Sequence, residues 1–132
     1  VNGAATLQSN ILNVIIEQPG RWWLATHRAI RIEQTWPGGV PLLNVPVAMV
    51  SRAYLKAAEA WQWAAMKPKP NEKLIEIGSA PGGSCQFYLD QGLRVTGVDP
   101  ADMDETVLKH PKFTHVRGRA IQMKRKFFAS FD

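Results

Sequence analysis

Residues 71–100 read NEKLIEIGSAPGGSCQFYLDQGLRVTGVDP, and this stretch decides the fold. Residues 74–77 form a short, mostly apolar run that ends at Gly78, which indicates a β-strand. After the glycine-rich turn, residues 84–91 predict a helix, and residues 93–98 predict a second strand. A strand, a helix and a second strand at this spacing form a βαβ unit, whose crossover makes the strands parallel. The sequence therefore predicts an α/β sheet, to which residues 113–116 add a third strand.

The glycine-rich turn indicates a nucleotide-like ligand, since glycine lets a ligand approach the backbone closely. Asp99 stands 21 residues after Gly78, where its carboxylate can accept hydrogen bonds from both hydroxyls of an adenosine ribose. A dinucleotide-binding turn needs G-x-G-x-x-G, but Ala80 takes the place of the middle glycine and Pro81 follows it. Glu76 would repel a pyrophosphate and suits the ammonium group of S-adenosylmethionine (SAM). The turn thus favours SAM, and a NAD-linked oxidoreductase is the weaker alternative.

A helix is predicted upstream of this unit. Ser51 is a good N-cap residue, and the KPKP run at residues 67–70 ends the helical pattern. Lys56 lies away from the stripe that we expect to face the core, which consists of Tyr54, Ala58, Trp61 and Ala65.

The N-terminal third is too small to form a stable domain by itself. Residues 6–17 carry many apolar side chains and are interpreted as a helix or a buried segment. Residues 21–32 predict one or two strands, and residues 36–46, rich in proline and glycine, resemble a linker. We therefore expect residues 1–46 to be an extension or the end of a larger domain, and residues 47–132 to form the α/β part.

Composition and charge indicate which partner and which cellular environment to expect. The 132 residues include 16 Lys and Arg against 11 Asp and Glu, a net charge of +5. Seven basic residues and no acidic residue lie between positions 109 and 126, which points to a nucleic-acid partner, with a solvated basic face as the equally open alternative. Cys85 is the single cysteine, so no disulfide is expected; we predict a core role for it and a reducing cytoplasmic environment. Neither a membrane span nor a metal site is expected, since apolar runs are short and the three histidines lack metal-ligand spacing.

Two motifs together resemble the FtsJ-like ribose 2′-O-methyltransferases: SRAYLK at residues 51–56 and EIGSAPGG at residues 76–83. WPGG at residues 36–39 and GVDPADMD at residues 97–104 are similar to the branch that methylates a cytidine ribose in large-subunit ribosomal RNA. The resemblance implies a Rossmann-like SAM-methyltransferase fold, of which residues 47–132 supply the N-terminal half of the parallel sheet with its flanking helices. It also implies that residues 1–46 are the remnant of a THUMP-like RNA-binding domain with a linker.

The implied reaction is SAM-dependent methyl transfer to a ribose 2′-hydroxyl of RNA, expected to be 23S ribosomal RNA. Lys56 matches the first catalytic lysine of the family. The implied cofactor-binding residues are Glu76, Gly78, Ser79, Ala80, Pro81, Gly82, Gly83 and Asp99, and the RNA-binding candidates are Arg52, Lys124, Arg125 and Lys126.

The family's other catalytic residues, an Asp, a second Lys and a Glu, are expected beyond Asp132, so this chain by itself is expected to lack turnover. An RNA-binding module without catalysis is therefore the second hypothesis. Plainer roles also stay open: Lys56 as a surface lysine paired with Glu59, Glu76 as a structural acid, and Asp99 as a turn former before Pro100.

Overall fold

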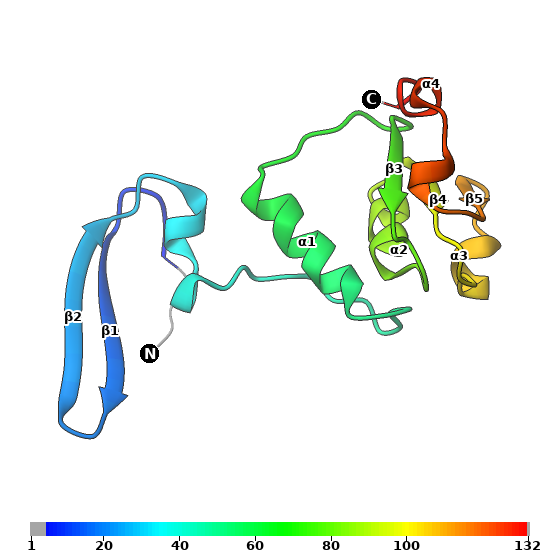
Figure 1. The fold of residues 1–132 in the computed structure, drawn as a ribbon. Helices are drawn as coiled ribbons and strands as arrows, with labels where there is room; N and C mark the ends of the chain where they lie inside the picture. The colour runs from blue at the N-terminus through cyan, green and yellow to red at the C-terminus, as the bar shows by residue number, and fades with distance from the viewer. Residues whose placement is uncertain (1–4, 132) are drawn as a thin grey trace. The chain divides into compact units, whose positions relative to one another are not determined.

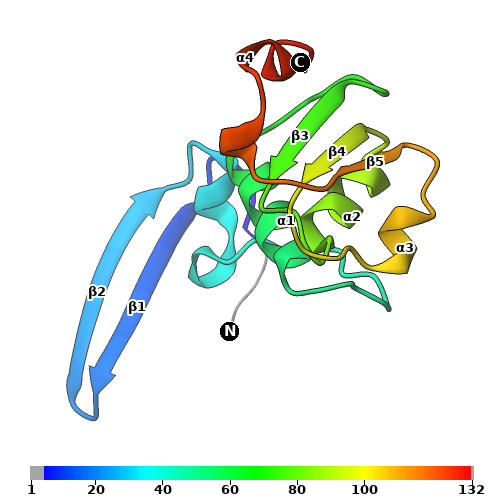
Figure 2. The ribbon, with the colours of Figure 1, turned by 45° about the vertical axis from the view of Figure 1, so that its right-hand side comes forward.

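The computed structural model describes residues 5–131 and divides the chain into two compact units, with the boundary between Leu42 and Leu43. Each unit has its own secondary structure, shown in Figures 1 and 2. In the described part of the chain, no helix is both long and apolar enough to cross a membrane.

The first unit is an antiparallel hairpin followed by two short 3-10 helices. Strand β1 (Asn10–Gln18) pairs with β2 (Arg21–Arg28), and η1 (Ile32–Thr35) and η2 (Pro37–Gly39) follow. The strand predicted within residues 21–32 is confirmed.

The interpretation of residues 6–17 as a helix or a buried segment is wrong, because most of them lie in the exposed strand β1. The prediction failed because the apolar content of one segment does not show that its side chains pair with those of another strand. Ile16 lies opposite Trp22 and Val14 lies opposite Leu24, and such cross-strand apolar pairs stabilise a strand.

The second unit contains the predicted parallel sheet. Strands β3 (Lys73–Ile77), β4 (Arg94–Val98) and β5 (Phe113–Val116) lie in the order β3-β4-β5, and both pairs are parallel. Helix α2 (Gly83–Asp90) connects β3 to β4, and α3 (Glu105–Leu108) precedes β5. The α/β fold class is confirmed, with the three-stranded parallel sheet and flanking helices expected of a Rossmann-like fold.

Two clusters of buried side chains hold the helices and the sheet together. Helix α1 (Ala53–Trp63) contacts α2 through edge-to-face rings, with Tyr54 and Phe87 centroids 5.3 Å apart. Tyr54 and Ala58 are buried as predicted, but Ala65 lies beyond the end of α1 and has a positive φ of 48°. The larger cluster lies between α2, α3 and the sheet and consists of Cys85, Leu89, Leu93, Val95, Met103 and Val107. Cys85 is fully buried in this cluster, which confirms its core position.

The last part of the chain follows β5 with η3 (Ala120–Gln122) and α4 (Arg125–Phe128). The rings of Phe127 and Phe131 pack edge to face with centroids 5.5 Å apart. This aromatic contact folds the end of the chain back on α4.

Candidate functional site

The glycine-rich turn and Asp99 meet at the carboxyl ends of β3 and β4. The Gly78 N–H donates to the Val98 carbonyl at 2.9 Å, and Asp99 follows Val98 directly. In parallel α/β sheets, ligands bind outside the carboxyl ends of the strands. The turn predicted from the sequence therefore occupies the position at which such folds bind ligands.

A cavity of about 320 Å³ opens beside this turn. Predicted site residues from three parts of the chain line it: Lys56 from α1, Glu76 from β3, and Gly78, Ser79 and Ala80 from the turn. The remaining lining residues come from α1 and α2 and are Ala53, Ala57, Ala60, Ser84 and Tyr88. The fold thus brings Lys56 and Glu76, 20 positions apart in sequence, to one cavity.

Glu76 is the half-buried acid of the cavity. Ser84 Oγ, in the first turn of α2, donates a hydrogen bond to Glu76 Oε1 at 2.7 Å. Burial raises the pKa of the Tyr88 phenol, and the negative charge of Glu76 raises it further. Burial likewise raises the pKa of the Cys85 thiol to about 12, with a further contribution from Glu76. Because Glu76 places a negative charge in the cavity wall, the cavity favours the binding of a cationic group.

Lys56 contributes a cation to the same cavity. It is exposed on α1, and no ion pair joins it to Glu59 or Glu76 among residues 5–131. An exposed ammonium can donate hydrogen bonds to a hydroxyl or a phosphate that enters the cavity.

Gly78 leaves space for a ligand. Its φ is +76°, which disfavours any side chain, and no described atom lies within 4 Å of the position that a Cβ would occupy. A ligand can therefore approach the backbone here.

Gly82 and Gly83 do not line this cavity, and the structure gives them a packing role. A Cβ on Gly82 would lie 2.8 Å from Val107 Cγ2, and a Cβ on Gly83 would lie 2.2 Å from Ser51 Oγ. Pro81 also lies outside the cavity lining, and its carbonyl accepts the Asp104 N–H at 2.8 Å. These three residues shape the turn and the start of α2.

Asp99 connects the turn to the end of β4. Its two carboxylate oxygens accept the Ala101 N–H at 2.8 Å and the Ala80 N–H at 3.1 Å. These two bonds hold the pKa of the Asp99 carboxyl below its usual value, and the bond from Ala101 makes the larger contribution. A carboxylate has about four lone-pair sites, so Asp99 keeps acceptor capacity for a ligand while it anchors Ala80.

The basic RNA-binding candidates are all exposed. Arg52 precedes α1, whereas Lys124, Arg125 and Lys126 lie at the start of α4. In the described part of the chain none of these four cations has an acidic partner. Two other basic residues of the 109–126 segment do form ion pairs, Lys109 with Glu105 and Arg117 with Asp102.

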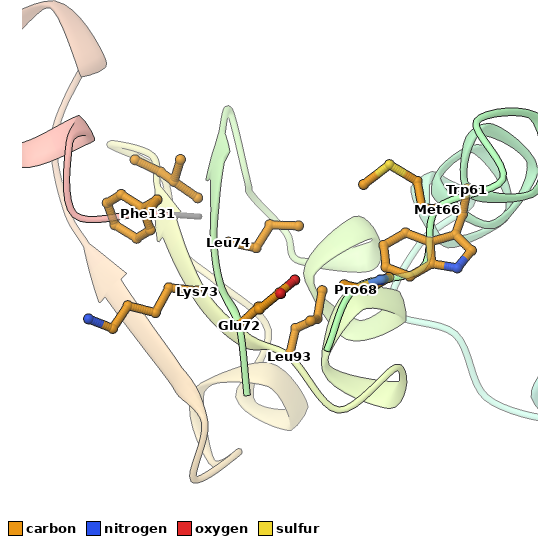
Figure 3. Close-up of a pocket in the computed structure, with 9 residues that line it drawn as sticks. Trp61, Met66, Pro68, Glu72, Lys73, Leu74, Leu93 and Phe131 are labelled. Atoms are coloured by element: carbon orange, nitrogen blue, oxygen red, sulfur yellow. The ribbon is translucent and has the colours of Figure 1, made fainter. Parts of the chain in front are cut away.

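A second, apolar cavity of about 160 Å³ lies beside the start of β3. Figure 3 shows Trp61 and Met66 on one side of β3, Phe131 on the other, and Leu74 and Leu93 between them. None of the residues predicted to bind the cofactor or RNA, and not Lys56, lines it. We therefore place the candidate site at the glycine-rich turn.

Sequence reasoning missed Ser84, Tyr88 and the three alanines of the cavity wall. The alanines had a signal, because Ala53, Ala57 and Ala60 fall at i, i+4 and i+7 with Lys56 on the same face of α1. Ser84 and Tyr88 had no such signal, since their orientation depends on how α2 lies against β3.

The sequence of the chain is similar to those of curated proteins. No protein-family model matches the chain. It is 32% identical over 92 residues to ribosomal RNA large subunit methyltransferase M of Halorhodospira halophila, covering 67% of this chain and 27% of that protein. It is 26% identical over 113 residues to the protein of the same name from Thauera aminoaromatica, covering 81% of this chain and 31% of that protein. The protein of this name from Saccharophagus degradans is 33% identical over 87 residues, covering 61% of this chain and 25% of that protein.

The chain therefore spans about a quarter to a third of the length of these curated relatives. The resemblance to ribosomal RNA methyltransferases that the two motifs predicted is confirmed.

Proposed function

Because the chain is similar to part of ribosomal RNA large subunit methyltransferase M, we propose that it is the SAM-binding part of a ribosomal RNA methyltransferase. The methyl acceptor in this proposal is a ribose 2′-hydroxyl of large-subunit ribosomal RNA. The observation that carries the proposal is the cavity at the carboxyl end of β3, which combines Glu76 with Lys56 beside the open Gly78.

The residues present fit SAM. Gly78 leaves open space for the ligand, Glu76 supplies an acceptor for an ammonium group, and Asp99 supplies acceptors for ribose hydroxyls. SAM supplies an electrophilic methyl group on its sulfonium. Glu76 would hold the amino-acid end of SAM, and Asp99 would hold its adenosine end.

Lys56 orients the acceptor hydroxyl in this proposal. Its ammonium would donate a hydrogen bond to the 2′-oxygen and so help to position the hydroxyl for methyl transfer. Alignment of two reactants can contribute roughly 7–11 kcal/mol to lowering a barrier. As the oxygen–carbon bond forms and the sulfur–carbon bond breaks, the hydroxyl proton passes to a base, which this proposal assigns to the longer protein outside this chain.

The basic residues supply the RNA contact. Arg52 lies four residues before Lys56, so a phosphate on Arg52 would bring the neighbouring ribose toward the cavity. Lys124, Arg125 and Lys126 supply a second group of exposed cations. We further propose that residues 1–46 are the end of a THUMP-like RNA-binding domain with its linker, and residues 47–132 the SAM-binding part.

The test is titration calorimetry of the folded chain with S-adenosylhomocysteine (SAH). We expect saturable binding to the wild type, and binding weakened about tenfold or more in Glu76→Ala, since one charge-assisted hydrogen bond is lost. Lys56→Met is the matched control, because Lys56 faces the acceptor and not the cofactor in this proposal. Heat from NAD but none from SAH would overturn the proposal in favour of an oxidoreductase.

The acceptor is tested in the longer protein with labelled SAM and large-subunit ribosomal RNA. A labelled 2′-O-methyl nucleoside after digestion supports the ribose assignment, and a labelled base contradicts it. RNA binding whose salt dependence falls in a Lys124→Gln, Arg125→Gln, Lys126→Gln variant, together with no SAH binding, would favour the module without catalysis.

A further inference from the structure

We propose that Ser84 is a positioning residue of this site, whose hydroxyl holds Glu76 toward the bound ammonium group and apart from Lys56. The inference deepens the function proposed above and rests on it. Neither the motifs nor the similarity to known proteins indicates a role for Ser84.

The contact itself is short and well placed. Ser84 Oγ lies 2.7 Å from Glu76 Oε1, in the range of a charge-assisted hydrogen bond. Ser84 is only 8% exposed and lies in the first turn of α2, whose backbone is held by packing against α1 and the sheet. A donor fixed in this way restricts the orientation of the Glu76 carboxylate.

The bond leaves half of the carboxylate available. Among residues 5–131, Glu76 Oε2 has no hydrogen-bond partner, whereas Oε1 is taken by Ser84. Oε2 can therefore accept a hydrogen bond from an ammonium group of a ligand.

The same bond separates two opposite charges that line one cavity. Lys56 and Glu76 both line it, yet no ion pair joins them. Two such groups attract one another and would neutralise each other if both side chains were free to move. With Glu76 held by Ser84, its charge stays available for the cofactor and Lys56 stays available for the acceptor.

The experiment compares two ligands that differ only in the ammonium group. Titration calorimetry measures the Kd of SAH and of the SAH analogue in which hydrogen replaces the α-amino group, using the full chain. The Kd of the analogue divided by the Kd of SAH reports how well Glu76 binds the ammonium group. We expect Ser84→Ala to lower this ratio about tenfold, and Ser84→Thr, which keeps a hydroxyl, to preserve most of it.

Ser51→Ala is the matched control. It also removes a serine hydroxyl, which accepts the Ala53 N–H at 3.3 Å just before α1 and does not contact Glu76. Any effect of this change on folding alters the affinity for both ligands together and leaves the ratio unchanged.

The outcomes separate the two proposals. An unchanged ratio in Ser84→Ala, or an equal loss of both affinities, would overturn the positioning role while the cofactor site stands. A wild-type chain that binds neither ligand while folded would overturn the proposed function and this inference with it. A lowered ratio in Ser84→Ala that the further change Lys56→Met partly restores supports the separation of Glu76 from Lys56.

Discussion

Substitution of Gly83 by alanine should destabilise the second unit more than the same exchange at Gly92, near the other end of α2. The added Cβ would lie 2.2 Å from Ser51 Oγ, 2.9 Å from the Ser51 carbonyl oxygen and 3.1 Å from the Tyr54 nitrogen. A rotation can move the hydroxyl of Ser51, but the other two atoms belong to the backbone. They also form the first-turn hydrogen bond of α1, from the Tyr54 N–H to the Ser51 carbonyl at 3.1 Å.

The magnitude follows from these contacts. Overpacking against a fixed backbone costs about 1–3 kcal/mol, and a weakened backbone hydrogen bond adds about 0.5–1.5 kcal/mol. We therefore expect Gly83→Ala to lower the free energy of unfolding by about 2–4 kcal/mol. For a unit of this size, that corresponds to a fall in melting temperature of about 10 °C or more.

Urea unfolding followed by circular dichroism, together with calorimetry, measures this change. Gly92→Ala is the matched control: it follows α2 at the other end, has a φ of +85°, and has no described atom within 4 Å of its Cβ position. Only backbone strain of about 1–2 kcal/mol is expected there. The double variant Ser51→Ala, Gly83→Ala should recover only part of the lost stability. It removes the contact with the Ser51 hydroxyl, but the contacts with the backbone remain. A Gly83→Ala protein no less stable than Gly92→Ala would refute the described packing of α1 on α2.

Three further predictions concern single groups. Cys85 is fully buried with its thiol pKa raised to about 12, so it should react with iodoacetamide only after unfolding; rapid alkylation of the folded chain, measured by mass spectrometry, would contradict this. The pKa of Asp99 is lowered in the folded state, so its stabilising contribution is present above its unfolded value near 3.8 and is lost as the pH falls further. Asp99→Asn should therefore flatten the acid limb of a stability–pH curve, and an unchanged limb would count against its anchoring role. Tyr54→Phe removes the bond from the Tyr54 hydroxyl to Asp90 Oδ2 at 3.0 Å and should cost about 1 kcal/mol in urea unfolding, whereas an unchanged midpoint would show that the bond contributes nothing.

Much of the second unit could be predicted because its signals are local. The short apolar run before Gly78 and the spacing to Asp99 require a strand, a turn, a helix and a strand within about 30 residues. The crossover connection then makes the strands parallel, whatever the rest of the protein contains. The hairpin of residues 10–28 was less predictable, because its apolar side chains match a strand only once the partner strand is known.

The residue types of the candidate site could be predicted, but not which of its glycines border the cavity and which pack against neighbouring helices. The motif placed Gly78, Gly82 and Gly83 in one group, yet only Gly78 borders the cavity. The other two glycines are required because α1 and α3 approach the start of α2 too closely for a side chain. Such a steric requirement depends on residues distant in sequence, so no local pattern reveals it.

The sequence by itself determined the βαβ unit, the glycine-rich turn and the acid that follows the second strand, since each depends on neighbouring residues. Only the tertiary structure decided that Lys56 shares a cavity with Glu76 and that Ser84 holds the Glu76 carboxylate. The physical reason is that these relations depend on how α1 and α2 pack against β3. That packing is set by buried side chains distributed over the whole second unit.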